Sequence, residues 1–185
     1  MPKAYNFERM IVLLVDDNRH MRTTISAMLR GFGVRQIVDA NDGSEALREL
    51  RAAAYDVCIC DWNMSPLDGI DFTRLVRTAS DSPNPFLPII MLTGYTEMAR
   101  IVEARDAGVT EFLAKPLSPK NLLLRLIEVV ERPRQFIKTK AYFGPDRRRH
   151  KDSNYTGAER RKGGAATPAP AAAMSQEEVE ALMNS

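Results

Sequence analysis

The chain has 185 residues, of which 44% are hydrophobic and 27% charged, as in a soluble globular protein of one ordinary domain with some additional sequence. This composition excludes a fully disordered, collagen-like or coiled-coil chain. No apolar run approaches the roughly 20 residues that a membrane-spanning helix needs, and the first residues lack the apolar core of a signal peptide. We therefore expect a cytoplasmic protein without membrane insertion.

Short apolar runs alternate with amphipathic stretches of helical spacing across residues 8–131. The predicted strands are residues 10–15, 34–38, 57–60, 87–92 and 109–113. The predicted helices are the periodic residues 21–29, a segment that opens at Asp42, and residues 70–79, 97–107 and 117–130. Because each strand is a nearly continuous apolar run, we expect a doubly wound parallel sheet of the α/β class, built from five strand–helix units.

Polar side chains follow four of the predicted strands, where doubly wound sheets bind their ligands. They are Asp16 and Asp17 after the first strand, Asp61 after the third, Thr93 after the fourth and Lys115 after the fifth. Three carboxylates at one edge repel each other, so a hard divalent cation such as Mg²⁺ is their natural partner. One carboxylate could then attack a phosphoryl group while the lysine and the hydroxyl hold its oxygens. A single acid could equally cap a helix, but five such positions favour a site.

Cys58 and Cys60, the two cysteines of the chain, stand two apart in a predicted strand and therefore point to one face. We interpret them as small core residues and expect neither a disulfide nor a metal site there.

Residues 8–131 resemble the receiver domains of bacterial response regulators, and CheY in particular. The motifs that carry the resemblance are residues 14–17 (LVDD), 60–69 (CDWNMSPLDG), 92–94 (LTG) and 115–116 (KP). The resemblance implies a flavodoxin-like fold and a signalling protein, not an enzyme. It makes Asp61 the phosphoacceptor, which would take its phosphoryl group from a phosphohistidine of a sensor histidine kinase.

The same resemblance assigns roles to the residues around Asp61. Asp17, Asp61 and the backbone carbonyl of Asn63 would ligate Mg²⁺, and Asp16 would assist through water. Lys115 and Thr93 would contact the phosphoryl oxygens. Phe112 occupies the position of the aromatic switch residue of the family. The loop at residues 81–86 is slightly longer than in the shortest members, which we expect to matter little to the site.

A basic extension follows the receiver-like part. Residues 132–162 contain eleven Lys or Arg and three acids, a balance of +8. The rest of the chain has 15 basic and 21 acidic residues, a balance of −6. An acidic body with a basic extension indicates an anionic partner.

The extension repeats a pattern of tyrosine, glycine, acid and two arginines, at residues 142–148 and 155–161. Arginine can donate paired hydrogen bonds to guanine or to phosphate, and arginine and tyrosine stack on bases. An acid can accept from the N1–H and N2–H₂ groups of guanine, and glycine permits a close approach. Two copies of a pattern that can bind guanine and phosphate suggest a two-fold symmetric ligand, cyclic di-GMP. The candidate ligand residues are Tyr142, Asp146, Arg147, Arg148, Arg149, Tyr155, Glu159, Arg160 and Arg161.

Residues 135–163 also resemble the arginine-rich extension of the Cle proteins, CheY-like regulators that bind cyclic di-GMP and act on the flagellar motor. This implies a flagellar motor switch protein as partner and a location at the flagellated pole. We expect residues 132–163 to be a flexible segment that orders on its ligand. The alternatives are a basic arm for nucleic acid or an acidic membrane, although we expect no specific DNA, and a phosphorylation-gated regulator whose extension has no specific function.

The last two segments are a linker and a terminal peptide. Residues 164–173 are rich in alanine and proline, as linkers are. Residues 174–185 open with a capping box and resemble the N-terminal motif of the flagellar switch protein to which CheY binds. This peptide either docks on the receiver near Tyr95 and Phe112 as an internal competitor or remains a solvated tail.

Overall fold

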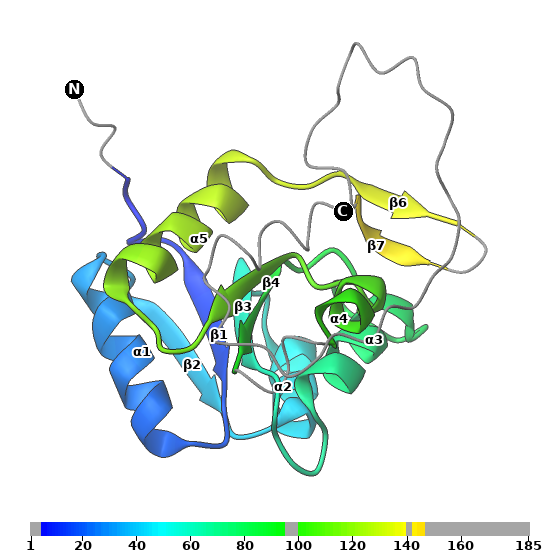
Figure 1. The fold of residues 1–185 in the computed structure, drawn as a ribbon, viewed down its shortest axis with the longest axis horizontal. Coiled ribbons are helices and arrows are strands. Elements are labelled where there is room, and N and C mark those ends of the chain that lie inside the picture. The colour runs from blue at the N-terminus through cyan, green and yellow to red at the C-terminus, as the bar shows by residue number, and fades with distance from the viewer. Residues whose placement is uncertain (1–4, 95–99, 140–141, 147–185) are drawn as a thin grey trace, which may run out of the picture.

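The computed structural model describes residues 5–94, 100–139 and 142–146. Within them, five strands form one parallel sheet in the order β2-β1-β3-β4-β5 (Figure 1). The strands are β1 (Ile11–Val15), β2 (Gln36–Ala40), β3 (Val57–Asp61), β4 (Ile89–Thr93) and β5 (Glu111–Ala114). The helices are α1 (Arg19–Gly31), α2 (Gly43–Ala52), α3 (Gly69–Thr78), α4 (Ile101–Ala107) and α5 (Pro119–Glu131). The predicted α/β doubly wound fold is confirmed.

Helices cover both faces of the sheet, α1 and α5 on one face and α2, α3 and α4 on the other (Figure 1). Successive strand residues alternate between two cores because the side chains of a strand point to opposite faces. Leu14 packs on the α1–α5 side and Leu13 on the other. Cys58 and Cys60 are buried free thiols on the α2–α4 side, which confirms their role as small core residues. None of the helices in the described part of the chain is long and apolar enough to span a bilayer.

Side-chain caps start four of these helices. Asn18, Asp42, Asp68 and Ser118 each accept a hydrogen bond from a backbone N–H of the first turn that follows. Such caps satisfy donors that would otherwise have no partner within the helix. They explain why α5 begins at Pro119, after its cap, and not at residue 117 as predicted. The predicted start of α4 at residue 97 falls outside the described residues.

Three strands, β2, β4 and β5, begin two residues later than the sequence predicts, and β2 and β5 do so for a shared reason. Gly33 and Gly108 both have a φ of +99°, the left-handed conformation that ends a helix. The next residue then turns back: the Val34 N–H donates to the Leu29 carbonyl, and the Val109 N–H to the Ala104 carbonyl. Each valine is buried, but its backbone N–H bonds to the end of the preceding helix, so the strand begins two residues later.

Part of the extension folds back on the receiver as a β-hairpin. Strands β6 (Phe136–Lys138) and β7 (Phe143–Pro145) pair antiparallel and form a second, small sheet beside the first (Figure 1). The sequence predicted a flexible segment at residues 132–163; within it the structure describes residues 136–138 and 143–145 as paired strands. Non-local contacts with the receiver supply the stabilisation that a two-stranded hairpin lacks by itself.

Aromatic rings and one arginine attach the hairpin. The Phe86 ring centroid lies 5.2 Å from that of Phe136 and 5.3 Å from that of Phe143, both edge to face. Arg77 of α3 is 3% exposed and places its guanidinium over the Phe136 ring, 5.1 Å from the centroid. The loop at residues 81–86, which was expected to matter little to the acidic site, contributes Phe86 to the attachment of the hairpin.

The backbones of the hairpin and the receiver also approach closely. A Cβ atom on Gly144 would lie 3.0 Å from Gly108 Cα and 2.5 Å from the Tyr142 hydroxyl. Arg134 Nη2 lies 3.2 Å from Glu111 Oε1 of β5, and its Nη1 donates to the Asp146 carbonyl at 3.3 Å. The hairpin is thus joined to the sheet through an ion pair as well as through rings.

Candidate functional site

The predicted site residues meet at one edge of the sheet. Asp16 follows β1, and Lys115 follows β5. Asp61 and Thr93 are the last residues of β3 and β4, one position earlier than the sequence suggested. Carboxylate oxygens of Asp16, Asp17 and Asp61 lie within 4.8 Å of one another, and Asp17 is exposed. Parallel topology produces this cluster because the carboxyl ends of the strands share an edge.

Lys115 is the cation of the cluster. Its Nζ donates to Asp61 Oδ1 at 2.7 Å and lies 4.0 Å from Asp16 Oδ2. The Lys115 backbone N–H donates to the Thr93 carbonyl at 2.8 Å, which positions the lysine at the end of β4. One ammonium group faces three carboxylates, so the cluster still has excess negative charge.

The pKa values of Asp16 and Asp61 are both raised, in agreement with this excess of negative charge. Burial raises the pKa of Asp16 to about 6, an effect that the Asn18 N–H opposes by donating to the carboxylate, while nearby Asp61 adds to the rise. Burial also raises the pKa of Asp61, against the opposing effect of Lys115. Asp16 Oδ2 is fully buried and has no hydrogen-bond partner among the described residues. A divalent cation would bring a bound water that can donate to this oxygen, and its charge would neutralise the cluster, so the residues fit such an ion.

Three further predicted residues lie around the cluster. Asn63 is exposed, two residues after Asp61. The Thr93 side chain is buried, and its hydroxyl donates to the Gly94 carbonyl at 3.2 Å. Phe112 is 1% exposed in the core on the α2–α4 side of the sheet, three residues before Lys115. Tyr95, near which the terminal peptide was predicted to dock, lies outside the described residues.

Gly69 is a site residue that the sequence analysis did not single out. Its N–H donates to the Trp62 carbonyl at 2.9 Å, and a Cβ atom there would lie 2.2 Å from the Asp61 carbonyl oxygen. The start of α3 therefore touches the backbone of Asp61. The sequence offered one indication of this role, a glycine directly after Asp68, the cap of α3. Glycine is required there because of the contact with the Asp61 carbonyl across the loop.

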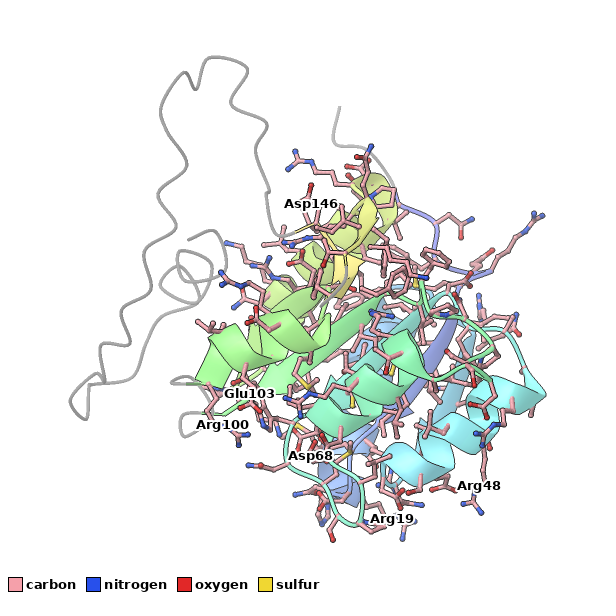
Figure 2. All side chains as sticks on the ribbon, turned by 90° about the vertical axis from the view of Figure 1, so that its right-hand side faces the viewer. Arg19, Arg48, Asp68, Arg100, Glu103 and Asp146 are labelled. Atoms are coloured by element: carbon pink, nitrogen blue, oxygen red, sulfur yellow. The ribbon has the colours of Figure 1, made fainter. Side chains whose placement is uncertain are left out.

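Of the ligand residues predicted in the extension, the structure describes Tyr142 and Asp146, and Figure 2 shows Asp146 far from Asp68, the cap of α3. Tyr142 donates its hydroxyl hydrogen to the Pro145 carbonyl at 2.8 Å, and the Asp146 N–H donates to the Gln135 carbonyl at 2.6 Å. The remaining candidates, Arg147, Arg148, Arg149, Tyr155, Glu159, Arg160 and Arg161, lie outside the described residues, as do the linker and the terminal peptide.

The Asp16→Asn variant is expected to be more stable than the parent protein at pH 7 without divalent cations, by about 3 kcal/mol. Asparagine keeps an acceptor for the Asn18 N–H but removes the charge. A carboxyl whose pKa rises to about 6 on folding favours the folded state below its unfolded pKa, and this contribution is lost as the pH rises through 6. The stability gain should therefore shrink to about 0.5 kcal/mol at pH 4.

Urea denaturation in EDTA at the two pH values measures this difference. Asp81→Asn is the control, because Asp81 forms an exposed ion pair with Arg51 and its replacement should change stability little. An equal gain for Asp16→Asn at both pH values would contradict the electrostatic explanation.

Comparison with known proteins agrees with this geometry. The model of the response regulator receiver domain family matches residues 12–127. Chemotaxis protein CheY of Pseudomonas aeruginosa is 36% identical over 123 residues, which are 66% of this chain and 98% of that protein. The transcriptional regulatory protein ZraR of Klebsiella oxytoca is 35% identical over 127 residues, 69% of this chain, but the match spans only 28% of that longer protein.

Two solved structures share the fold. CheY4 of Vibrio cholerae is 38% identical with a TM-score of 0.59, covering 65% of this chain and 98% of that one. The receiver domain of sensor histidine kinase PA1611 from Pseudomonas aeruginosa is 34% identical with a TM-score of 0.56, covering 64% of this chain and 94% of that one. Its structure holds a magnesium ion in the active-site cleft. The family match over residues 12–127 and the identity with CheY show that the chain belongs to the response regulator receiver family and that its receiver domain is CheY-like, and the carboxylate cluster and Lys115 lie at one edge of its five-stranded parallel sheet.

Proposed function

We propose that this protein is a CheY-like signalling protein of the Cle subgroup, which binds cyclic di-GMP through its arginine-rich extension and acts on the flagellar motor. The observation that carries the proposal is the duplicated tyrosine–glycine–acid–diarginine pattern in a basic segment of an otherwise acidic chain. The proposed ligand residues are those of the two copies, from Tyr142 to Arg149 and from Tyr155 to Arg161.

The hairpin supports a specific role for the first copy. Tyr142 and Asp146 belong to a folded element, joined to the receiver through Arg134 and the aromatic contacts. Arg147 follows Asp146 directly in the sequence, so the first arginine pair is the next part of the chain after this folded element. An inert or purely electrostatic arm would need no such attachment. Gly144 is already required for close packing against Gly108, a structural role in addition to any contact with a ligand.

The receiver supports a second activity, phosphorylation of Asp61 by a sensor histidine kinase. The observation that favours it is the contact of Lys115 Nζ with Asp61 Oδ1 beside two further carboxylates. An Asp61 carboxylate oxygen would attack the phosphorus of the phosphohistidine, the P–N bond would break, and an acyl phosphate would form on Asp61.

Residues around Asp61 would support this transfer. Asp17, Asp61 and the Asn63 carbonyl would hold Mg²⁺, with Asp16 acting through water, and the ion would offset the negative charge of the carboxylates and the phosphoryl group. Lys115 and Thr93 would bind the phosphoryl oxygens, and Phe112 would respond as the switch residue. Phenylalanine has no hydroxyl group, so a buried Phe112 leaves no polar atom unpaired.

Replacing Arg147 and Arg148 together with alanine is expected to abolish cyclic di-GMP binding and any motor binding that depends on it. Each lost arginine removes charged hydrogen bonds and a stacking surface, so affinity should fall at least about 100-fold. Calorimetric titration of the full chain with cyclic di-GMP, with GMP and duplex DNA as controls, measures the loss and the stoichiometry.

The Asp61→Asn variant separates the two activities, because it should lose phosphorylation and keep cyclic di-GMP binding. Binding to the motor switch protein is then measured for both variants, with and without the nucleotide. Comparable binding of cyclic di-GMP, GMP and DNA, or motor binding that follows only Asp61 phosphorylation, would overturn the main proposal in favour of a phosphorylation-gated regulator.

A further inference from the structure

A cavity of about 380 Å³ lies between the extension and the receiver. The extension contributes Arg132, Pro133, Arg134 and Phe136 to its wall, and the receiver contributes, among others, Phe86 and Glu128. Its other walls come from the residue before β4 and from the start of β5, so it opens at the edge of the sheet opposite the carboxylate cluster. The cavity is large enough for a small ligand and exists because the extension folds back.

The charged groups of the cavity differ in how firmly they are engaged. Glu111 is 2% exposed and pairs with Arg125 at 3.3 Å and with Arg134 at 3.2 Å, so this group serves to hold the hairpin. Glu128 and Arg132 form a wider pair of 3.6 Å, with side chains 32% and 76% exposed. An exposed ion pair of this kind contributes little to stability. The Glu128 carboxylate and the Arg132 guanidinium can therefore leave this ion pair and bind groups of a ligand with little loss of stability.

The walls combine flat apolar surfaces with two ion pairs, Glu111–Arg134, which holds the hairpin, and the more exposed Glu128–Arg132. Phe86 and Phe136 contribute aromatic rings to the lining, and Pro88 and Pro133 contribute apolar pyrrolidine rings. Rings of this kind pack against a planar base. A carboxylate at the rim selects a base whose edge donates two N–H groups in the same direction, which guanine does and adenine does not. An arginine beside it suits the phosphate of a nucleotide.

We propose that this cavity is a guanine site, in which Glu128 accepts hydrogen bonds from N1–H and N2–H₂ of the base and Arg132 binds a phosphate. The inference rests on the proposed function for the identity of the nucleotide, as it places one guanine of cyclic di-GMP here. The chain path agrees with this. Arg134, which lines the cavity, donates to the Asp146 carbonyl, and Asp146 directly precedes the first arginine pair.

The Glu128→Gln variant of the full chain tests the site. Glutamine keeps the shape and the helix but offers one acceptor in place of a charged pair, so the dissociation constant for cyclic di-GMP should rise at least about tenfold in calorimetric titration. Glu8→Gln is the matched control, because Glu8 forms a similar exposed pair with Arg35 at 3.5 Å, away from the cavity. The control should bind as the parent protein does.

A second variant, Phe86→Leu, and an NMR titration of the parent protein test the same site without relying on Glu128→Gln. Phe86 is 56% exposed, so the receiver should stay folded without its ring. Loss of the ring should weaken cyclic di-GMP binding about tenfold. In NMR titrations of the parent protein, cyclic di-GMP should shift the backbone amide signals of Thr110 and Val129, which line the cavity. Cyclic di-AMP should shift them far less.

The outcomes separate this inference from the proposed function. Unchanged affinity in Glu128→Gln and Phe86→Leu, with binding still dependent on Arg147 and Arg148, would overturn the cavity site alone. Equal shifts with cyclic di-AMP would overturn its assignment to guanine. If the chain showed no preference for cyclic di-GMP but GMP shifted the cavity amides and Glu128→Gln weakened that binding, the site would stand and the proposed function would fail. No binding of either guanine nucleotide would overturn both.

Discussion

The Gly69→Ala variant is expected to lose at least about 3 kcal/mol of unfolding free energy. An added Cβ atom would lie 2.2 Å from the Asp61 carbonyl oxygen and 3.0 Å from Met91 Sδ. Real atoms do not approach so closely, so either α3 or the end of β3 must move. Urea denaturation measures the loss in stability.

The same movement should affect the site, because Asp61 is the residue whose backbone is displaced. Mg²⁺ affinity of the folded Gly69→Ala protein, followed in a titration, should fall together with stability. Gly31→Ala is the control: Gly31 is the last residue of α1, and a Cβ atom there meets nothing within 4 Å. That substitution should stabilise by about 0.5–1 kcal/mol. A Gly69→Ala protein as stable as the parent would show that the loop relaxes without strain.

The Arg77→Met variant should lose about 3 kcal/mol and release the hairpin from the receiver. Arg77 Nε donates to the Gly108 carbonyl at 3.0 Å and Nη1 to the Pro85 carbonyl at 2.9 Å. Burial lowers the pKa of Arg77 to about 10, so the side chain remains charged at neutral pH. Methionine keeps the apolar stem but removes both hydrogen bonds and the cation that covers the Phe136 ring.

Hydrogen exchange shows whether the hairpin is released. The amides of Thr139 and Asp146 donate to the Tyr142 and Gln135 carbonyls within the hairpin, so they should exchange much faster in Arg77→Met. Arg74→Met is the matched control, one turn earlier in α3. Arg74 is 47% exposed in its side chain and pairs with Asp71 and Glu103 on the surface, so stability should change by less than about 1 kcal/mol. Equal exchange rates in both variants would mean that Arg77 does not hold the hairpin.

Arg77 also links the extension to a helix of the receiver. Its Nε bonds the carbonyl of Gly108, the residue that ends α4, and its guanidinium covers a ring of β6. The hairpin and the end of α4 therefore share one buried side chain. The same contact explains why a long side chain at position 108 would fail, since a Cβ atom on Gly108 would lie 3.0 Å from Arg77 Cγ in addition to the strain of its φ of +99°.

The sequence predicted the features that local chemistry and strand order determine. Continuous apolar runs predicted a parallel sheet covered on both faces, and the strand-end positions of Asp16, Asp61 and Lys115 predicted the cluster. Both follow because parallel strands place their carboxyl ends at one edge wherever the exact boundaries fall. Errors of two residues at the starts of β2, β4 and β5 left the site intact for this reason.

Only the tertiary structure decided the features that depend on residues far apart in the chain. The hairpin is stable because Phe86 meets Phe136 and Arg77 reaches Gly108, and Gly69 is required because α3 returns to the Asp61 carbonyl. The composition of residues 132–146, basic and poor in apolar runs, indicates a solvated arm when taken by itself. The contacts that fold it are donated by the receiver, so their energy is absent from the local pattern and appears only when distant surfaces are brought together.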